Sequence, residues 1–252
     1  MSNKQDLLIE IGTEELPPKS LKLLAPAFHQ EICNSLKEYG LAFSEASWFA
    51  TPRRLAVIIK QLDMSQPDTQ QQRRGPAISA AFDNDGKPTR ATIGFANSCG
   101  IAVDQLKKME TQKGSWLVFD TLAKGKHTHE LIPDTINTAL KRLPIAKRMR
   151  WGNNDFEFVR PIKWILLLLG TETVDCEIMG VKSGKHSYGH RFHHPESIDI
   201  INASDYVKRL KQNGKVIADY DERCFLIKEQ IKKVATESNG TAVINPQLLD
   251  EV

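Results

Sequence analysis

Apolar residues along this chain follow two spacings, one that predicts strands and one that predicts helices. Compact apolar runs at Asp6–Ile11, Leu55–Leu62 and Trp164–Leu169 have the length and composition of buried strands. Elsewhere apolar side chains recur every three or four residues, which is typical of an amphipathic helix. This helical spacing is clearest in two sets of positions: Leu21, Leu24, Phe28, Ile32 and Leu36, and Phe225, Ile227, Ile231 and Val234.

The order of these elements predicts the fold class. The chain opens with strand, helix, strand and strand, and its later strands and helices mix without a regular βαβ rhythm. We therefore expect an α+β fold with mixed, largely antiparallel sheets and packed helices. Three shorter runs are also expected to be strands: Val174–Met179, Lys215–Ile217 and Ala242–Ile244.

A polar, glutamine-rich stretch at Gln66–Arg74 interrupts the apolar pattern and is the best boundary candidate in the first half of the chain. It fits either a linker or a solvated edge strand. The residues that follow carry a short helical pattern and a strand of their own, so we expect an inserted module at 66–145. Because the last residues carry no stop signal, we also expect 1–252 to be the N-terminal region of a longer chain, truncated after 252.

Charge changes this picture because it is unevenly distributed. The formal net charge is only +3, yet Lys141–Lys163 holds seven cationic side chains against two carboxylates. Cations mixed with aromatic rings are typical of surfaces that hold phosphates and stack on bases. We therefore predict an RNA-binding or partner-binding segment there, with four candidate residues: Lys147, Arg148, Arg150 and Trp151. The alternative, a set of ordinary solvated cations, stays open.

Two further segments offer binding residues. Arg53 and Arg54 follow Pro52 in a predicted turn, where they could form bidentate contacts with a phosphate, because two arginines on a turn project to opposite sides and one can stay exposed. Equally, one of them could be buried against a carboxylate. Four histidines crowd into residues 186–194, and His190 and Arg191 are the candidates there for contact with phosphate or a partner chain. A metal site is the weaker interpretation of this loop, because it has no HExxH motif and no nearby cysteine.

The sequence offers little for catalysis. Phosphate loops of the GxxxxGK[ST] and GxGxxG types and a GxSxG elbow are absent, so we predict no catalytic residue, no metal and no cofactor in this chain. The adjacent Glu14 and Glu15 precede a predicted helix, where negative charge is favourable for electrostatic reasons alone. The four cysteines are widely spaced, and the chain has neither a signal segment nor a long apolar span, so we expect a cytoplasmic protein with no membrane segment.

Several of these segments together resemble the β subunits of the bacterial heterotetrameric glycyl-tRNA synthetases. The resemblance runs along essentially the whole chain. The motifs that carry it are LLIEIGTEELPP at 7–18, FATPRRLAV at 49–57, RRGPAISAAFDNDGKPT at 73–89, GFANSCG at 94–100, KRMRWG at 147–152, FVRPIKWILLLLG at 158–170, GHRF at 189–192, GKVIADYDER at 214–223 and the closing LLDEV.

The resemblance implies a division of labour. In that family the α subunit activates glycine with ATP and magnesium, and the β subunit supports tRNA recognition. The implied partners are therefore an α subunit, tRNA(Gly) and a second β subunit in a heterotetramer. The resemblance further implies a fold similar to the B3/B4 domain of phenylalanyl-tRNA synthetase. Family β chains are longer and add an HD-type domain and a helical anticodon-binding domain.

We therefore expect a noncatalytic segment of a glycine-tRNA ligase that supports tRNA recognition and subunit assembly. Two alternatives stay open. The chain could be a subunit-interaction scaffold without RNA contact, because Trp and Arg also concentrate at the centres of protein interfaces. It could also be an editing-like hydrolase domain that uses the histidine-rich loop.

Overall fold

The computed structural model describes residues 4–83, 85–112 and 114–251, which form two compact units. The first unit combines the chain up to Gln66 with the chain from Lys126 onward, and the second is Pro67–Gly125. The second unit therefore begins next to the expected boundary. The expected module at 66–145 ends later in the sequence than the second unit does. The helix at Thr128–Arg142 falls inside the expected module but belongs to the first unit.

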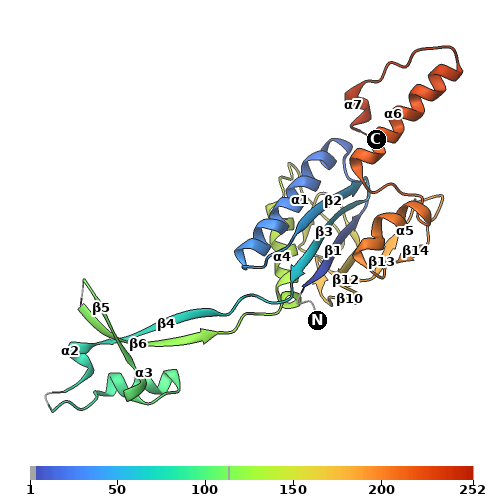
Figure 1. The fold of residues 1–252 in the computed structure, drawn as a ribbon. Coiled ribbons are helices and arrows are strands. Elements are labelled where there is room, and N and C mark those ends of the chain that lie inside the picture. Colours follow the sequence, from blue (N-terminus) through green and yellow to red (C-terminus); the bar gives the residue numbers. More distant parts are fainter. Residues whose placement is uncertain (1–3, 84, 113, 252) are drawn as a thin grey trace. The chain divides into compact units, whose positions relative to one another are not determined.

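The first unit is built on a mixed sheet in the order β11-β12-β9-β1-β3-β2, with β10 added to β9 (Figure 1). Among the strands described, β12 runs parallel to β9 and the other pairs of this sheet are antiparallel. The α+β prediction is thus confirmed. The strands are β1 (Lys4–Thr13), β2 (Glu45–Thr51), β3 (Arg54–Asp63), β9 (Ile162–Leu169), β10 (Glu172–Thr173), β11 (Glu177–Ile178) and β12 (Val181–Gly184).

Both faces of this sheet are covered, which explains why its central strands are continuous apolar runs. Alternation places Leu7, Ile9 and Ile11 of β1 in one core, and the matching positions of β3 and β9 join them. α1 (Pro18–Glu38) and α4 (Thr128–Arg142) pack on that face (Figure 1).

The opposite face carries Leu8 of β1 with Leu166 and Leu168 of β9 in a second, smaller core. It is covered by β13 (His186–Tyr188), β14 (Ser197–Asp199), the turn η2 (Ala203–Asp205) and α5 (Tyr206–Gln212). Glu10, Arg54 and Trp164 belong to this face by the same alternation, so the sheet carries its buried charges on the α5 side.

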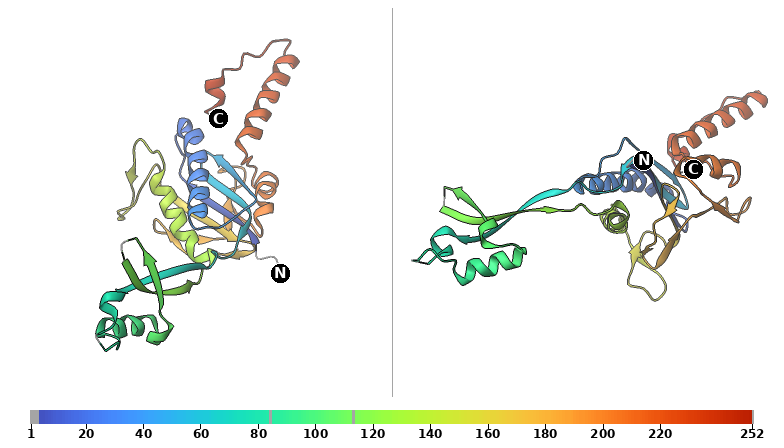
Figure 2. Two further views of the ribbon diagram at one scale, coloured as in Figure 1. Left: turned by 60° about the vertical axis from the view of Figure 1, so that its left-hand side comes forward. Right: turned by 60° about the horizontal axis from the view of Figure 1, so that its bottom comes forward.

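The remaining elements of the first unit are peripheral. β7 (Met149–Arg150) and β8 (Glu157–Phe158) form a short hairpin, and α6 (Tyr220–Glu237) extends from the sheet before the chain turns back to α7 (Pro246–Leu249), as Figure 2 shows.

The strand predictions at Lys215–Ile217 and Ala242–Ile244 are wrong, because these apolar triplets are extended but pair with no strand among the described residues. The single strand expected over Val174–Met179 is also wrong, since only β11 falls within it.

The second unit is a three-stranded antiparallel sheet in the order β4-β6-β5 with short helices. Its glutamine-rich strand β4 is an exposed edge strand. Of the two alternatives for this stretch, a linker or a solvated edge strand, the second is therefore correct. The Arg74 guanidinium stacks 3.5 Å from the centre of the Trp116 ring, which joins β4 to its neighbour. The elements are β4 (Thr69–Ala77), α2 (Ile78–Ala81), α3 (Arg90–Cys99), η1 (Val103–Gln105), β5 (Lys107–Thr111) and β6 (Gly114–Ala123).

Candidate functional site

A buried ion pair lies at the centre of the sheet face that α5 covers. Glu10 is fully buried and Arg54 is 2% exposed, and their nearest charged atoms, Oε2 and Nη1, are 3.3 Å apart. Register explains the pairing, because Arg54 lies opposite Gly12 on the neighbouring strand, two residues from Glu10 on the same face. A buried charge pair of this kind is stable only when its remaining hydrogen-bonding capacity is satisfied.

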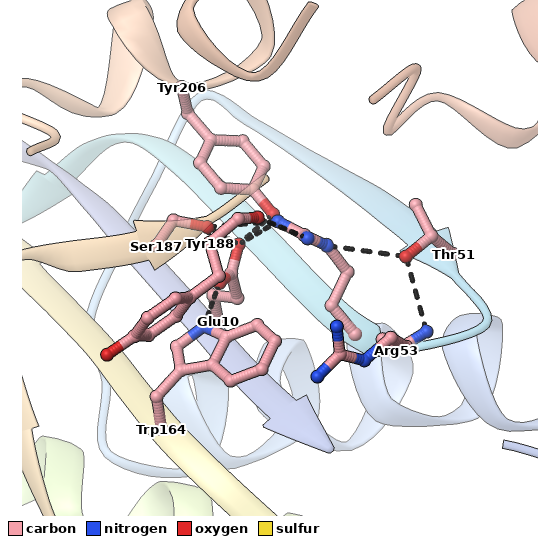
Figure 3. Close-up of polar contacts among 8 residues, drawn as sticks. Glu10, Thr51, Arg53, Trp164, Ser187, Tyr188 and Tyr206 are labelled. Atoms are coloured by element: carbon pink, nitrogen blue, oxygen red, sulfur yellow. Dashed lines mark hydrogen bonds and ion pairs between the residues drawn. The ribbon is translucent and has the colours of Figure 1, made fainter. Parts of the chain in front are cut away.

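The Glu10 carboxylate meets that condition, because three other side chains donate to it (Figure 3). Trp164 donates its indole N–H, Tyr206 its hydroxyl, and Ser187 its hydroxyl at 2.7 Å. Burial, reinforced by the Glu10 charge, raises the pKa of the Tyr206 hydroxyl well above its usual value. Tyr206 therefore stays protonated and remains a donor at physiological pH.

Arg54 uses its other donors to join three segments of chain. Its Nη2 donates to the Tyr188 carbonyl at 2.6 Å, and its Nε donates to the Thr51 hydroxyl at 3.3 Å. The guanidinium thus links the turn between β2 and β3 to the strand β13. The loop that follows Tyr188 is held beside that turn as a result.

A pocket of about 360 Å³ opens between these two segments. We call it the arginine pocket. The loop after β13 is fixed tightly against it: the His190 N–H donates to the Gly214 carbonyl at 2.7 Å, and a Cβ on Gly189 would lie 2.4 Å from the His194 carbonyl oxygen. The lining residues are Glu15, Thr51, Pro52, Arg53, Arg54, Gly189, His190, Arg191, Phe192, Lys215, Val216, Ile217 and Arg223.

Positive charge dominates this lining. Arg191 is exposed and lies 3.2 Å from the Glu15 carboxylate, while Lys215 donates to the Gln212 carbonyl at 2.9 Å. Arg223 donates to two backbone carbonyls at 2.8 and 3.0 Å, and burial lowers the pKa of its guanidinium from the usual value. The pocket therefore offers charge and hydrogen-bond donors to an anion.

Arg53 and Arg54 both line this space, but only Arg54 is held in the buried ion pair with Glu10. Arg53 lines the arginine pocket and also a second hollow of about 350 Å³ on its other side, next to Trp164 and Lys163. Its Nε is buried and has no hydrogen-bond partner among the described residues. Arg54, by contrast, forms the buried ion pair with Glu10 where it lines the arginine pocket.

Four of the eight binding candidates thus meet in one place: Arg53, Arg54, His190 and Arg191. Lys215, Arg223 and Glu15 also line the pocket but were not among the predicted binding residues. Lys215 was expected only as part of a strand, and nothing in the local pattern of Lys215 or Arg223 distinguishes them from solvated cations. Only the packing of α6 and of the chain before it against the β2–β3 turn brings them to the pocket.

The other four candidates lie elsewhere in the first unit, and most are engaged in internal contacts. Arg150 pairs with Glu157 at 2.9 Å, and Trp151 packs partly against the main core. Arg148 donates to the Lys141 and Glu157 carbonyls at 2.8 and 3.3 Å. Lys147 is exposed and lines a separate hollow of about 580 Å³ with Leu23 and Met149.

The contacts of Arg148 predict a structural effect. Its guanidinium ties the end of α4 to β8, so Arg148→Ala is expected to lower the free energy of unfolding by about 1 kcal/mol, as loss of hydrogen bonds to backbone carbonyls usually does. Arg150→Ala removes two exposed ion pairs, with Glu157 and Asp155, and should cost at most about 0.5 kcal/mol. Urea denaturation of both variants checks this, and equal losses would contradict it.

The remaining histidines and the acidic pair are not arranged as one reactive centre. His186 lies 2.5 Å from Asp199 and His194 lies 3.4 Å from Glu196, so they have different partners. Glu14 bonds Lys163 at 3.1 Å, which lowers the pKa of Glu14, whereas Glu15 faces Arg191. Within the described residues no group of three or more His, Cys, Asp or Glu side chains is placed to hold a metal ion.

Comparison with known proteins points to one family. The family model described as "Glycyl-tRNA synthetase beta subunit" matches residues 7–252. The chain is 50% identical over 250 residues to a glycine–tRNA ligase β subunit of Hahella chejuensis, 51% over 249 residues to one of Marinobacter nauticus, and 46% over 249 residues to one of Edwardsiella ictaluri. These matches cover 98–99% of this chain and 36% of each relative.

No helix in the described part of the chain combines the length and apolar content needed to cross a bilayer.

Proposed function

We propose, from the premise that this chain belongs to the family of glycyl-tRNA synthetase β subunits, that it supports tRNA recognition and subunit assembly in glycyl-tRNA formation. Bond-making chemistry, with its ATP and magnesium, would reside in a partner α subunit, and the chain itself would be noncatalytic and cytoplasmic. The chain spans about 36% of the length of its curated relatives, so their whole activity is not assigned to it.

The observation that carries the RNA half of this proposal is the arginine pocket. Exposed Arg191 and Lys215 lie on its rim, and Phe192, which is 79% exposed, lies beside them. Cations that can reach phosphates next to an aromatic ring that can stack on a base are the usual elements of single-stranded RNA recognition. The Lys147–Trp151 segment stays a predicted second contact.

A different observation supports the assembly half. The hollow beside Lys147 is lined by apolar side chains, including Leu23 at 54% and Met149 at 38% exposure. Lys19, Lys147 and Arg160 also line it. Apolar surface bordered by charge is the pattern of a protein interface. This surface is our candidate for contact with the α subunit or with a second β subunit.

The RNA contact is tested by salt-dependent binding of tRNA(Gly). For the double variant Arg191→Gln/Lys215→Gln we expect weaker binding and a slope of log K against log salt that falls by about 1 for each lost phosphate contact. A charge-matched control, Lys208→Gln/Lys228→Gln, removes two exposed lysines outside the pocket and should keep the slope. If the pocket variant retains both its affinity and its slope, the pocket does not contact tRNA.

A further inference from the structure

The charge of the arginine pocket exceeds what one backbone phosphate of RNA requires. Arg54 is neutralised by Glu10, so it does not contribute to the excess. Glu15 is the single carboxylate of the described lining, and it faces Arg191. Arg223 is engaged with backbone carbonyls, so it is left out of the count, and the cations that remain are Arg53, Arg191 and Lys215.

Three cations against the single Glu15 carboxylate leave an excess of two positive charges, which suits a dianion better than a monoanion. A phosphodiester within an RNA strand carries one negative charge, whereas a phosphate monoester carries about −1.5 to −2 at pH 7 and presents three acceptor oxygens. Arg53 lines the pocket with its guanidinium donors, and the Lys215 ammonium has protons beyond the one it gives to Gln212. These donors match a terminal phosphate.

The size and borders of the pocket fit one nucleotide. Its volume of about 360 Å³ lies at the small end of ligand sites, too small for a duplex. Val216 and Ile217 provide apolar wall, and the exposed Phe192 ring on the rim is available to stack on a base. The charged and apolar parts of a nucleotide therefore both find a counterpart.

Contacts within the chain fix the walls of the pocket. Gly189 lies against the Gly214 and His194 carbonyls with no room for a side chain, and Arg54 fixes the Tyr188 carbonyl just before it. A site that is rigid before binding loses less entropy when its ligand arrives.

We propose that the arginine pocket binds the terminal phosphate monoester of a nucleotide, with Arg53 and Lys215 on the phosphate and Phe192 on the base. Two sources share this chemistry: a free 5′-mononucleotide and the 5′-phosphorylated end of an RNA. The second source rests on the proposed role in tRNA recognition, and the first does not.

The direct test is calorimetric titration of the 252-residue chain with AMP, adenosine and the methyl ester of AMP, which is a monoanion. We expect AMP to bind at least tenfold more tightly than either comparison ligand. Arg53→Met and Lys215→Gln should each weaken AMP binding at least tenfold, and Lys228→Gln on the exposed side of α6 should not. Lys215 is exposed, so its variant keeps the test valid if Arg53→Met fails to fold. Equal affinity for AMP and its methyl ester would overturn the proposal.

The source is identified with tRNA(Gly) carrying a 5′-phosphate or a 5′-hydroxyl. At least fivefold tighter binding of the phosphorylated form, with competition by AMP, selects the RNA end. AMP binding with no difference between the two tRNA forms selects the free nucleotide. If both tRNA forms bind equally and AMP does not bind, the monoester proposal fails while the tRNA function stands. If AMP binds and tRNA does not, the tRNA function fails while the monoester site stands.

Discussion

Replacing Arg54 with methionine is expected to lower the free energy of unfolding of this chain by about 3–5 kcal/mol, the usual cost of removing one partner from a buried ion pair. The variant leaves the fully buried Glu10 charge without its counterion. It also removes the donors that hold the Thr51 hydroxyl and the Tyr188 carbonyl. Urea denaturation followed by circular dichroism measures the loss.

Two further variants test whether this loss of stability comes from breaking a buried ion pair. Glu229→Gln breaks an exposed pair with Lys232 and should cost no more than about 0.5 kcal/mol. The double variant Glu10→Gln/Arg54→Met removes both buried charges, so it should be less destabilised than the sum of its two single variants. A loss below about 1 kcal/mol for Arg54→Met, or strict additivity in the double variant, would show that the pair is not coupled as described.

The second large effect is expected for Gly12→Ala. Gly12 lies opposite Trp164 on β9, and a Cβ built on it would fall 2.0 Å from two carbons of the indole ring. The ring cannot move away freely, because its N–H donates to Glu10. We expect a loss of about 3 kcal/mol in the free energy of unfolding, the upper part of the range for overpacked sites.

A glycine of the same sheet supplies the control for this substitution. Gly184 on β12 has a single neighbouring atom near its would-be Cβ, a His186 ring carbon at 4.0 Å, so Gly184→Ala should change stability by less than about 0.5 kcal/mol. In a Trp164→Leu background Gly12→Ala should cost much less than in the wild type, since the clashing ring is gone. Thermal and urea denaturation measure the stability of all these variants. An equal cost of Gly12→Ala in both backgrounds would refute the steric explanation.

The elements that local pattern predicted correctly are those whose burial follows a simple period. The strand at Asp6–Ile11 and the strand at Trp164–Leu169 are buried on both faces, so their apolar runs are unbroken, and α1 keeps one apolar stripe against the sheet. Lys215–Ile217 has the composition of a strand but pairs with none in the described chain. Composition cannot distinguish an extended segment that packs by its side chains from one that also bonds by its backbone.

The candidate site was predicted only in part, for a related reason. Sequence could place Arg53 and Arg54 on a turn and offer two alternatives, contact with a phosphate or burial of one arginine against a carboxylate. It could not state which arginine is buried, because that depends on Arg54 lying beside Gly12, within reach of Glu10. The aromatic and cationic segment around Arg148 was the most conspicuous pattern in the chain, yet Arg148 mostly bonds backbone carbonyls.

By itself the sequence determined the α+β class, the main strands and helices, and the family to which this chain belongs, because these follow from local periodicity and from contiguous motifs. Tertiary structure alone decided that Arg53, Arg191, Lys215 and Arg223 line one pocket and that Glu10 neutralises Arg54 beneath it. The physical reason is distance along the chain: Arg53 and Arg223 are 170 residues apart, and only strand register and the packing of β13 and α6 bring the charges of the pocket together.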